Sequence, residues 1–308
     1  MNKTLVLVGK NVDVFFKREI DNVSFCDTYN RKIPFPILRV VRNLNSLVYH
    51  ALGRWKKSIN EYDTIILFDG DASPSLVKWV EKHANKNCRL IFYYRNKVKA
   101  CRREFSPLVL SNTRYELWSY NIHDCEEFGL KYNNQVLNYE IVDKIAANIK
   151  VEEPVWDVVF LGAAKGREEQ LADISEYCER NGLSAYIYVV GGQSVKNNKC
   201  VDGKLLSYAE YIELVINSRA VLDVVTDRNW GLTLRPIEAF RLNKKLITNY
   251  RDIDRYDFYN SDNIFCFDES LDGLSTFLNG GFVHISDSIV DGYDIKEWFK
   301  HFGEENKC

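Results

Sequence analysis

Two carboxylates stand one glycine apart at the end of an apolar run, in the stretch "TIILFDGDASPS". Asp69 and Asp71 directly follow residues 64–68, whose apolar and β-branched side chains indicate a buried strand. Such an Asp-x-Asp can hold a divalent metal ion against a nucleoside diphosphate. The same letters also fit a strand end, a tight turn and a helix capped by Ser73 or Ser75, with Pro74 in its first turn.

A second group of residues suited to binding chemistry lies in "VVFLGAAKGREEQL". Gly162 ends an apolar run, and Lys165, Gly166 and Arg167 fill the turn before a helical pattern. Backbone N–H groups at a helix start, together with two cations, suit a diphosphate. The spacing lacks the G-x-G-x-x-G fingerprint, and the next strand, "YVVGGQ", ends without an acid for a ribose, which disfavours NAD.

The third group lies in "NWGLTLRPIEAFRLNKKLITNY", residues 229–250. A turn with Gly231 and Thr233 leads into a helix whose first turn carries Arg235 and Glu238. Arg235 could face a pyrophosphate, and Glu238 could accept both hydroxyls of a ribose. Alternatively, the two form a surface ion pair contributing about 0.2–0.5 kcal/mol. We favour the ligand interpretation because a Gly, an Arg and a Glu meet at one strand–helix junction.

These groups need parallel sheets to position them. Short apolar runs alternate with helical patterns along the whole chain, and the series restarts after residues 148–156. The pattern predicts an α/β fold with two doubly wound, Rossmann-like domains, residues 1–150 and 151–308. Their ligands are expected at the carboxyl ends of the strands, in a cleft that the two domains face.

Two helical patterns bear on this organisation. Residues 36–59 carry apolar side chains at helical spacing. The pattern in residues 294–307 places Ile295, Trp298, Phe299 and Phe302 on one side. We expect this last helix to pack back across the domain junction.

Composition narrows the classes of function. The eight cysteines form no CxxC pair and the five histidines are dispersed, so neither a metal centre nor a disulfide framework is expected. No run reaches the ~18–20 apolar residues of a membrane span, and the first residues lack a signal-peptide core, so we expect a cytoplasmic protein. Residues 1–150 carry 24 Lys and Arg against 16 Asp and Glu, whereas residues 151–308 carry 17 against 27. The positive first half, including the basic stretch 93–105, suggests an anionic partner or chance variation of a solvated surface.

The pattern "G-x-T-x-R-x-x-E-A", a helix and "K-x-L-I-T-N" resemble the donor-binding region of GT-B-fold glycosyltransferases of lipopolysaccharide core, O-antigen and capsule biosynthesis. The preceding "LLSYAEYIELVINSRAVLDVV" resembles their nucleobase-side segment, and "LWSYNIHDCEEFGLKYNNQVLNY" their interdomain stretch. One departure is Trp230, which stands where many retaining members have a second Glu. The resemblance implies a nucleotide-sugar site at Gly162, Lys165, Gly166, Arg167, Tyr208, Gly231, Thr233, Arg235 and Glu238, with Leu206 and Ser207 near the base.

The resemblance also implies the reaction. The expected activity is that of a metal-independent Leloir glycosyltransferase that needs no cofactor, because cations and helix ends stabilise the leaving diphosphate. The candidates for the base that deprotonates the acceptor are Asp13, Asp69 and Asp71. The expected partners are a nucleotide sugar, an anionic glycolipid or polysaccharide acceptor and the inner face of the plasma membrane, but no nucleic acid. A nucleotide-sugar epimerase and a non-catalytic, nucleotide-binding scaffold of polysaccharide assembly are the alternatives.

Overall fold

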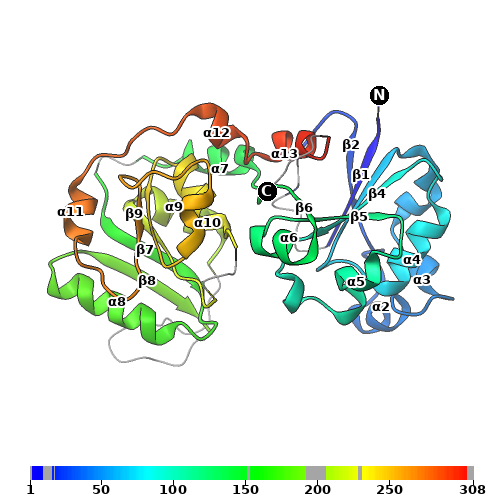
Figure 1. The fold of residues 1–308 in the computed structure, drawn as a ribbon, viewed down its shortest axis with the longest axis horizontal. Helices are drawn as coiled ribbons and strands as arrows, with labels where there is room; N and C mark the ends of the chain where they lie inside the picture. The colour runs from blue at the N-terminus through cyan, green and yellow to red at the C-terminus, as the bar shows by residue number, and fades with distance from the viewer. Residues whose placement is uncertain are drawn as a thin grey trace. The chain divides into compact units, whose positions relative to one another are not determined.

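The computed structural model describes residues 2–9, 16, 18–150, 153–191, 206–227 and 231–303. The chain divides into two compact units, each built on one parallel sheet (Figure 1). The first unit comprises Met1–Asn134 and Trp298–Cys308, and the second comprises Gln135–Glu297. Two α/β units with parallel sheets are the fold class that the sequence predicts.

The first unit contains a six-stranded sheet of order β2-β1-β3-β4-β5-β6. Its central strands are apolar runs buried on both faces, as expected when helices cover a parallel sheet. The strands are β1 Thr4–Val8, β2 Val23–Asp27, β3 Thr64–Phe68, β4 Arg89–Tyr94, β5 Tyr115–Ser119 and β6 Lys131–Tyr132. The α-helices are α2 Phe35–Val41, α3 Val48–Ala51, α4 Pro74–His83, α5 Pro107–Leu110 and α6 Ile122–Phe128. Two edge strands are not predicted from the sequence: β2, whose side chains are all only partly buried, and β6, which has only two residues.

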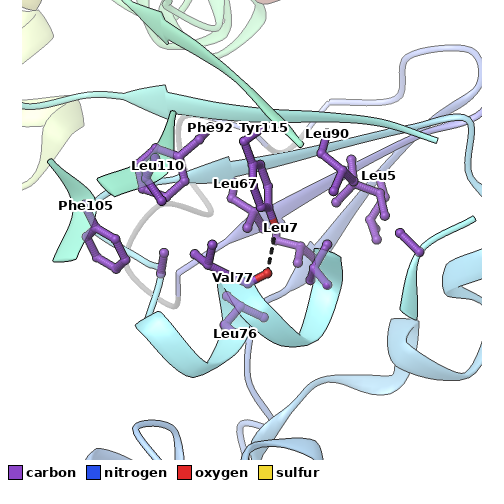
Figure 2. Close-up of a cluster of buried hydrophobic side chains, with 14 of the residues drawn as sticks. Leu5, Leu7, Leu67, Leu76, Val77, Leu90, Phe92, Phe105, Leu110 and Tyr115 are labelled. Atoms are coloured by element: carbon purple, nitrogen blue, oxygen red, sulfur yellow. Dashed lines mark hydrogen bonds between the residues drawn. The ribbon is translucent and has the colours of Figure 1, made fainter. Parts of the chain in front are cut away.

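The core of the first unit lies between the sheet and α4. Figure 2 shows Leu76 and Val77 of α4 among side chains of β1, β3 and β4. The Tyr115 hydroxyl donates a hydrogen bond to the backbone carbonyl of Val77 at 3.1 Å, the dashed line in that view. Ser73 caps α4 by accepting a hydrogen bond from the backbone N–H of Leu76, with Pro74 at the helix start. The strand, turn and capped-helix interpretation of "DGDASPS" is therefore confirmed.

The second unit contains a five-stranded parallel sheet of order β11-β10-β9-β7-β8. Its strands are β7 Trp156–Ala163, β8 Ala185–Val190, β9 Ser218–Asp223, β10 Lys245–Thr248 and β11 Ile264–Cys266. Its α-helices are α7 Tyr139–Ala146, α8 Glu168–Arg180, α9 Tyr208–Ile216, α10 Leu234–Arg241, α11 Leu274–Asn279 and α12 Asp287–Asp291, and α13 Ile295–His301 follows. In both sheets, strand order reverses beside the first strand of the unit, between β1 and β3 and between β7 and β9. Ligands of open α/β sheets bind at such switch points.

The border between the units differs from the predicted one. The second unit begins at Gln135, not after residue 150, because α7 packs against α9. The chain returns to the first unit at Trp298, whose side chain is fully buried. The ring centroids of Trp298 and Tyr93 lie 5.1 Å apart. The Trp298 indole N–H donates to the carbonyl of Asn134 at 3.0 Å. The apolar face of the last helix thus completes the core of the first unit.

The helical pattern of residues 36–59 does not form one helix. It is divided into α2, α3 and the 3₁₀ turn Arg54–Lys57. Helix-disfavouring Asn43 and Asn45 lie in the turn between α2 and α3, and Gly53 follows α3. The consequence is a surface-exposed α2 in which no residue is buried.

Candidate functional site

The second unit has a pocket of about 470 Å³ lined by residues from the carboxyl ends of β7 and β8 and from the first turns of α9 and α10. It therefore lies beside the β7–β9 switch point. Apolar walls with a few convergent polar groups are typical of small-molecule sites. The lining residues are Leu161, Gly162, Ala163, Val190, Leu206, Ser207, Tyr208, Tyr211, Leu234, Arg235 and Glu238. Of the residues predicted to bind the nucleotide, six are brought together here: Gly162, Leu206, Ser207, Tyr208, Arg235 and Glu238.

Glu238 is the buried carboxylate of this pocket, with 3% of its surface exposed. Its Oε1 accepts a hydrogen bond from the Tyr208 hydroxyl at 2.9 Å, and its Oε2 accepts one from Tyr211 at 2.7 Å. Burial raises the pKa of Glu238, and the two tyrosine donors partly oppose that rise. Both oxygens expected to meet a ribose thus already hold hydroxyl groups from α9. Glu238 is shaped to accept a pair of hydroxyls.

Arg235 does not pair with Glu238, as the surface-ion-pair alternative requires, but with Asp223. Its Nη1 lies 3.1 Å from Oδ1 of Asp223, and its Nη2 donates to the carbonyl of Leu161 at 2.7 Å. Burial opposes the charge on Arg235, but Asp223, Tyr211 and Glu238 together outweigh burial and raise the pKa of the guanidinium. Thr233 caps α10 and donates to the other oxygen of Asp223 at 2.8 Å. Arg235 is therefore fixed in position, with its Nε buried and unpaired among the described residues.

Arg167 stabilises the turn after β7 and is not among the described residues that line the pocket. Its guanidinium donates to the backbone carbonyls of Ala163 and Val224. The Arg167 and Arg235 guanidinium groups each lie over the Phe160 ring, at 4.8 and 4.9 Å from its centroid. Burial and the neighbouring Arg235 lower the pKa of Arg167 to about 10. Its contacts fit a structural role.

Gly162 allows the two cations to approach the strand. A Cβ atom at this position would lie 2.6 Å from Nη2 of Arg235 and 2.9 Å from Nη2 of Arg167. Lys165 and Gly166 follow in an exposed turn, outside the residues that line the pocket. Gly231 precedes Thr233 at the start of α10. Glycine at position 162 therefore leaves room for both guanidinium groups beside the strand.

The raised pKa of Glu238 predicts a pH dependence of stability. The native state binds this proton more tightly than the unfolded chain, where the ordinary pKa is 4.5. The corresponding stabilisation is complete below pH 4.5 and is lost as pH rises through the native pKa. We expect the free energy of unfolding of wild type, relative to Glu238→Gln, to fall as pH increases from 4 to higher values. Denaturant titrations of both proteins across that pH range measure the two free energies of unfolding. If wild type instead becomes more stable relative to Glu238→Gln as pH rises, the pKa of Glu238 is not raised.

In the first unit, Asp69 accepts hydrogen bonds from the loop that follows β4. Its Oδ1 accepts the backbone N–H of Arg95 at 2.8 Å, and its Oδ2 accepts the Asn96 side chain at 2.7 Å. The Cys101 thiol also contacts Oδ2, at 3.2 Å. Both oxygens are therefore occupied by a loop of the same unit.

Asp71 lies at the β1–β3 switch point, beside Gly9. A Cβ atom on Gly9 would lie 2.0 Å from Oδ1 of Asp71, so glycine at this position lets the Asp71 carboxylate approach the backbone. Burial raises the pKa of Asp71, while Arg95, with Nη2 at 3.4 Å from Oδ2, and the backbone N–H of Gly9 lower it in part. A raised pKa makes this carboxylate a stronger base than an ordinary aspartate.

Some predicted residues lie outside the described part of the chain, and some important residues were not predicted. Asp13 and Trp230 belong to the first group. Asp223, Tyr211 and Asn249 belong to the second; Asn249 is buried and bonds both the N–H and the carbonyl of Val225. An acid inside the apolar run "AVLDVV" is the signal that points to Asp223, since unpaired buried carboxylates are rare.

Two features are absent from the residues that the structure describes. These residues contain no group of three or more His, Cys, Asp or Glu side chains placed to hold a metal ion. Within the same ranges, every helix is too short or too polar to cross a membrane.

Comparison with known proteins defines the fold. Neither a protein-family model nor a curated protein sequence matches the chain. Solved structures do match over nearly the full length, and they share the two-unit, parallel-sheet α/β architecture of GT-B glycosyltransferases and UDP-GlcNAc 2-epimerases.

Three solved structures illustrate this similarity. An α-glucosyltransferase, solved with UDP-glucose and DNA, is 11% identical with a TM-score of 0.59 and covers 97% of both chains. HepE from Anabaena, solved with UDP, is 10% identical with a TM-score of 0.56 and covers 98% of both. The UDP-GlcNAc 2-epimerase from Methanocaldococcus jannaschii is 11% identical with a TM-score of 0.55 and covers 98% of both.

Proposed function

We propose that this protein is a glycosyltransferase that uses a nucleoside-diphosphate sugar, with the nucleotide bound in the pocket of the second unit. The observation that carries the proposal is the buried Glu238 carboxylate, which holds two hydroxyl groups at the edge of a pocket with apolar walls. A nucleoside needs apolar surroundings for its base and an acceptor for its ribose hydroxyls, and the residues that line this pocket include both.

The cations of the second unit suit the diphosphate. Arg235 lines the pocket, and Lys165 lies in the exposed turn after β7. Such groups stabilise the negative charge that develops when the bond between the anomeric carbon and the diphosphate breaks. In this proposal no metal ion is required for that step.

The fold supports the same class of ligand. The α-glucosyltransferase was solved with UDP-glucose and HepE with UDP. Together with the pocket, this favours a uridine nucleotide as the first donor to test.

We assign the proton transfer to the first unit. As the acceptor oxygen attacks the anomeric carbon, its proton passes to a carboxylate and the nucleoside diphosphate leaves. Asp71 fits this role better than Asp69, because Asp69 is committed to the backbone of Arg95 and the side chain of Asn96. The resemblance in sequence favours an acceptor of the lipopolysaccharide-core or polysaccharide type. It also favours a transfer reaction that takes place at the inner face of a membrane.

A second candidate function is epimerisation of a UDP-sugar. The similarity to the epimerase from Methanocaldococcus jannaschii is comparable in TM-score and coverage to that of the transferases. The products separate the two: an epimerase changes UDP-GlcNAc with no acceptor present, whereas a transferase releases UDP when an acceptor is supplied. Nucleotide binding with neither product indicates a non-catalytic scaffold.

The first experiment is a thermal-shift titration with UDP, TDP, GDP, CDP and NAD, each with and without Mn²⁺. At about one hundred times Kd, one nucleoside diphosphate is expected to raise the unfolding temperature by roughly 5–10 °C without metal. Stabilisation only with Mn²⁺ contradicts metal-independent binding and favours a divalent metal ion held by Asp69 and Asp71. A response to NAD alone, or to none of the nucleotides, overturns the proposal.

A further inference from the structure

Helix α2 and the turn after it expose apolar side chains in an unusual concentration. Phe35 is 68% exposed, Ile37 54% and Val40 60%, and Leu44 and Leu47 in the following turn are also exposed. A surface helix of a folded domain normally buries one apolar face, but α2 buries none of its residues. Contiguous exposed apolar side chains mark an interaction surface.

The same part of the chain is strongly basic. Between Asp27 and Glu61 there are seven Lys and Arg residues and no Asp or Glu. Lys32, just before α2, lines a cavity of about 630 Å³ together with Arg54 and Lys57, and all three are exposed. Arg39 is exposed in the last turn of α2. We call the five apolar residues with Lys32 and Arg39 the α2 surface.

The α2 surface is held on the first unit. Helix α2 packs against α3, and the Ser73 hydroxyl at the start of α4 donates to the carbonyl of Arg42 at 2.6 Å. The guanidinium of Arg42 lies over the Tyr29 ring at 5.8 Å. Figure 1 shows α2 at the lower margin of the first unit in that view. The exposed side chains are therefore presented by an anchored segment of the fold.

We propose that the α2 surface binds the surface of a lipid bilayer that contains anionic lipids. Apolar side chains enter the boundary between headgroups and acyl chains, and the cations meet lipid phosphates. Insertion and charge attraction together supply the two signals that peripheral binding needs. This inference rests on the membrane location in the proposed function and adds the residues that contact the bilayer, and it requires neither a nucleotide nor a sugar.

Charge distinguishes the bilayer from other occupants. A second copy of the chain, related by a two-fold axis, brings the same cations of both copies together, with no acid between Asp27 and Glu61 to offset them. A nucleic acid satisfies the cations, but its phosphates offer nothing to Phe35, Ile37 and Val40. Anionic lipid satisfies both.

The test is flotation of the full-length protein with vesicles of phosphatidylcholine alone and of equal parts phosphatidylcholine and phosphatidylglycerol. We expect binding to the anionic vesicles that weakens as salt increases. Phe35→Gln should lower the partition coefficient about tenfold, from the loss of one inserted aromatic side chain. Lys32→Gln and Arg39→Gln should each lower it about fivefold on anionic vesicles only.

The matched control is Val155→Gln, which alters an apolar side chain of the second unit that is as exposed as Val40, at 60%. It should leave vesicle binding unchanged, and all variants should keep the unfolding temperature of wild type. Failure of wild type to bind anionic vesicles overturns the inference. A dimer that Phe35→Gln dissociates assigns the surface to a second copy instead. Loss of duplex DNA binding in Lys32→Gln and Arg39→Gln, with vesicle binding intact, assigns it to nucleic acid. None of these results depends on the nucleotide titration.

Discussion

Replacing Asp223 with alanine is expected to lower the free energy of unfolding by about 3–5 kcal/mol, because it leaves the Arg235 guanidinium without its counter-charge. Asp223 is 2% exposed and receives hydrogen bonds from Arg235 and Thr233, at 3.1 and 2.8 Å. Denaturant unfolding of wild type and variant measures the change as a lower midpoint at constant m value.

A surface ion pair supplies the matched control for this prediction. Asp268 lies 3.0 Å from Arg251, but both side chains are 61% exposed. Asp268→Ala should therefore cost less than about 1 kcal/mol. The double variant Asp223→Leu/Arg235→Met should regain much of the lost stability, since paired apolar replacements remove the stranded charge. An Asp223→Ala effect no larger than that of Asp268→Ala contradicts the assigned role.

Replacing Glu238 with alanine is expected to weaken nucleoside-diphosphate binding by about a hundredfold or more. Hydrogen bonds to a charged group contribute about 1.5–3 kcal/mol each, and this carboxylate offers two oxygens to a pair of hydroxyls. Before ligand binds, Tyr208 and Tyr211 hold those oxygens. We expect the ribose hydroxyls to displace the tyrosine hydroxyls from these oxygens or to donate to the same oxygens beside them. Isothermal titration with the stabilising nucleotide measures the loss of affinity in Glu238→Ala.

The control for Glu238 lies on the neighbouring helix. Glu213 is an exposed carboxylate of α9 that does not line the pocket. Glu213→Ala should leave Kd unchanged. If a folded Glu238→Ala protein binds nucleotide as tightly as wild type, Glu238 is only a structural acceptor for two tyrosines, and the ribose assignment is wrong.

Local pattern was sufficient to predict most of the fold. Apolar runs such as residues 64–68 and 157–162 become central strands because a parallel sheet covered by helices needs side chains that can be buried on both faces. The sequence pattern failed to predict the secondary structure where contacts with the rest of the unit determine it. Strand β2 is a half-buried edge, and residues 36–59 show helical spacing although the chain turns at Asn43–Asn45 and Gly53.

The site divides in a similar way. Its location was predictable, since Gly162, Arg235 and Glu238 stand at strand–helix junctions of one parallel sheet, and such junctions meet at one edge. The partners of these residues were not. Arg235 pairs with Asp223, twelve residues earlier, and Glu238 with Tyr208 and Tyr211, about thirty residues earlier. Only the register of β7, β9 and the two helices brings them together.

The return of the chain to the first unit at Trp298 bears on how this protein is made. The ends of the second unit are joined by hydrogen bonds, from Leu137 N–H to the carbonyl of Tyr293 and from Ile295 N–H to that of Leu137. Residues 135–297 thus form a closed insertion that can fold as soon as it leaves the ribosome. The first unit, although its sheet is translated earlier, lacks the buried Trp298 until that residue emerges. During synthesis, the unit that starts first is therefore the one that finishes last.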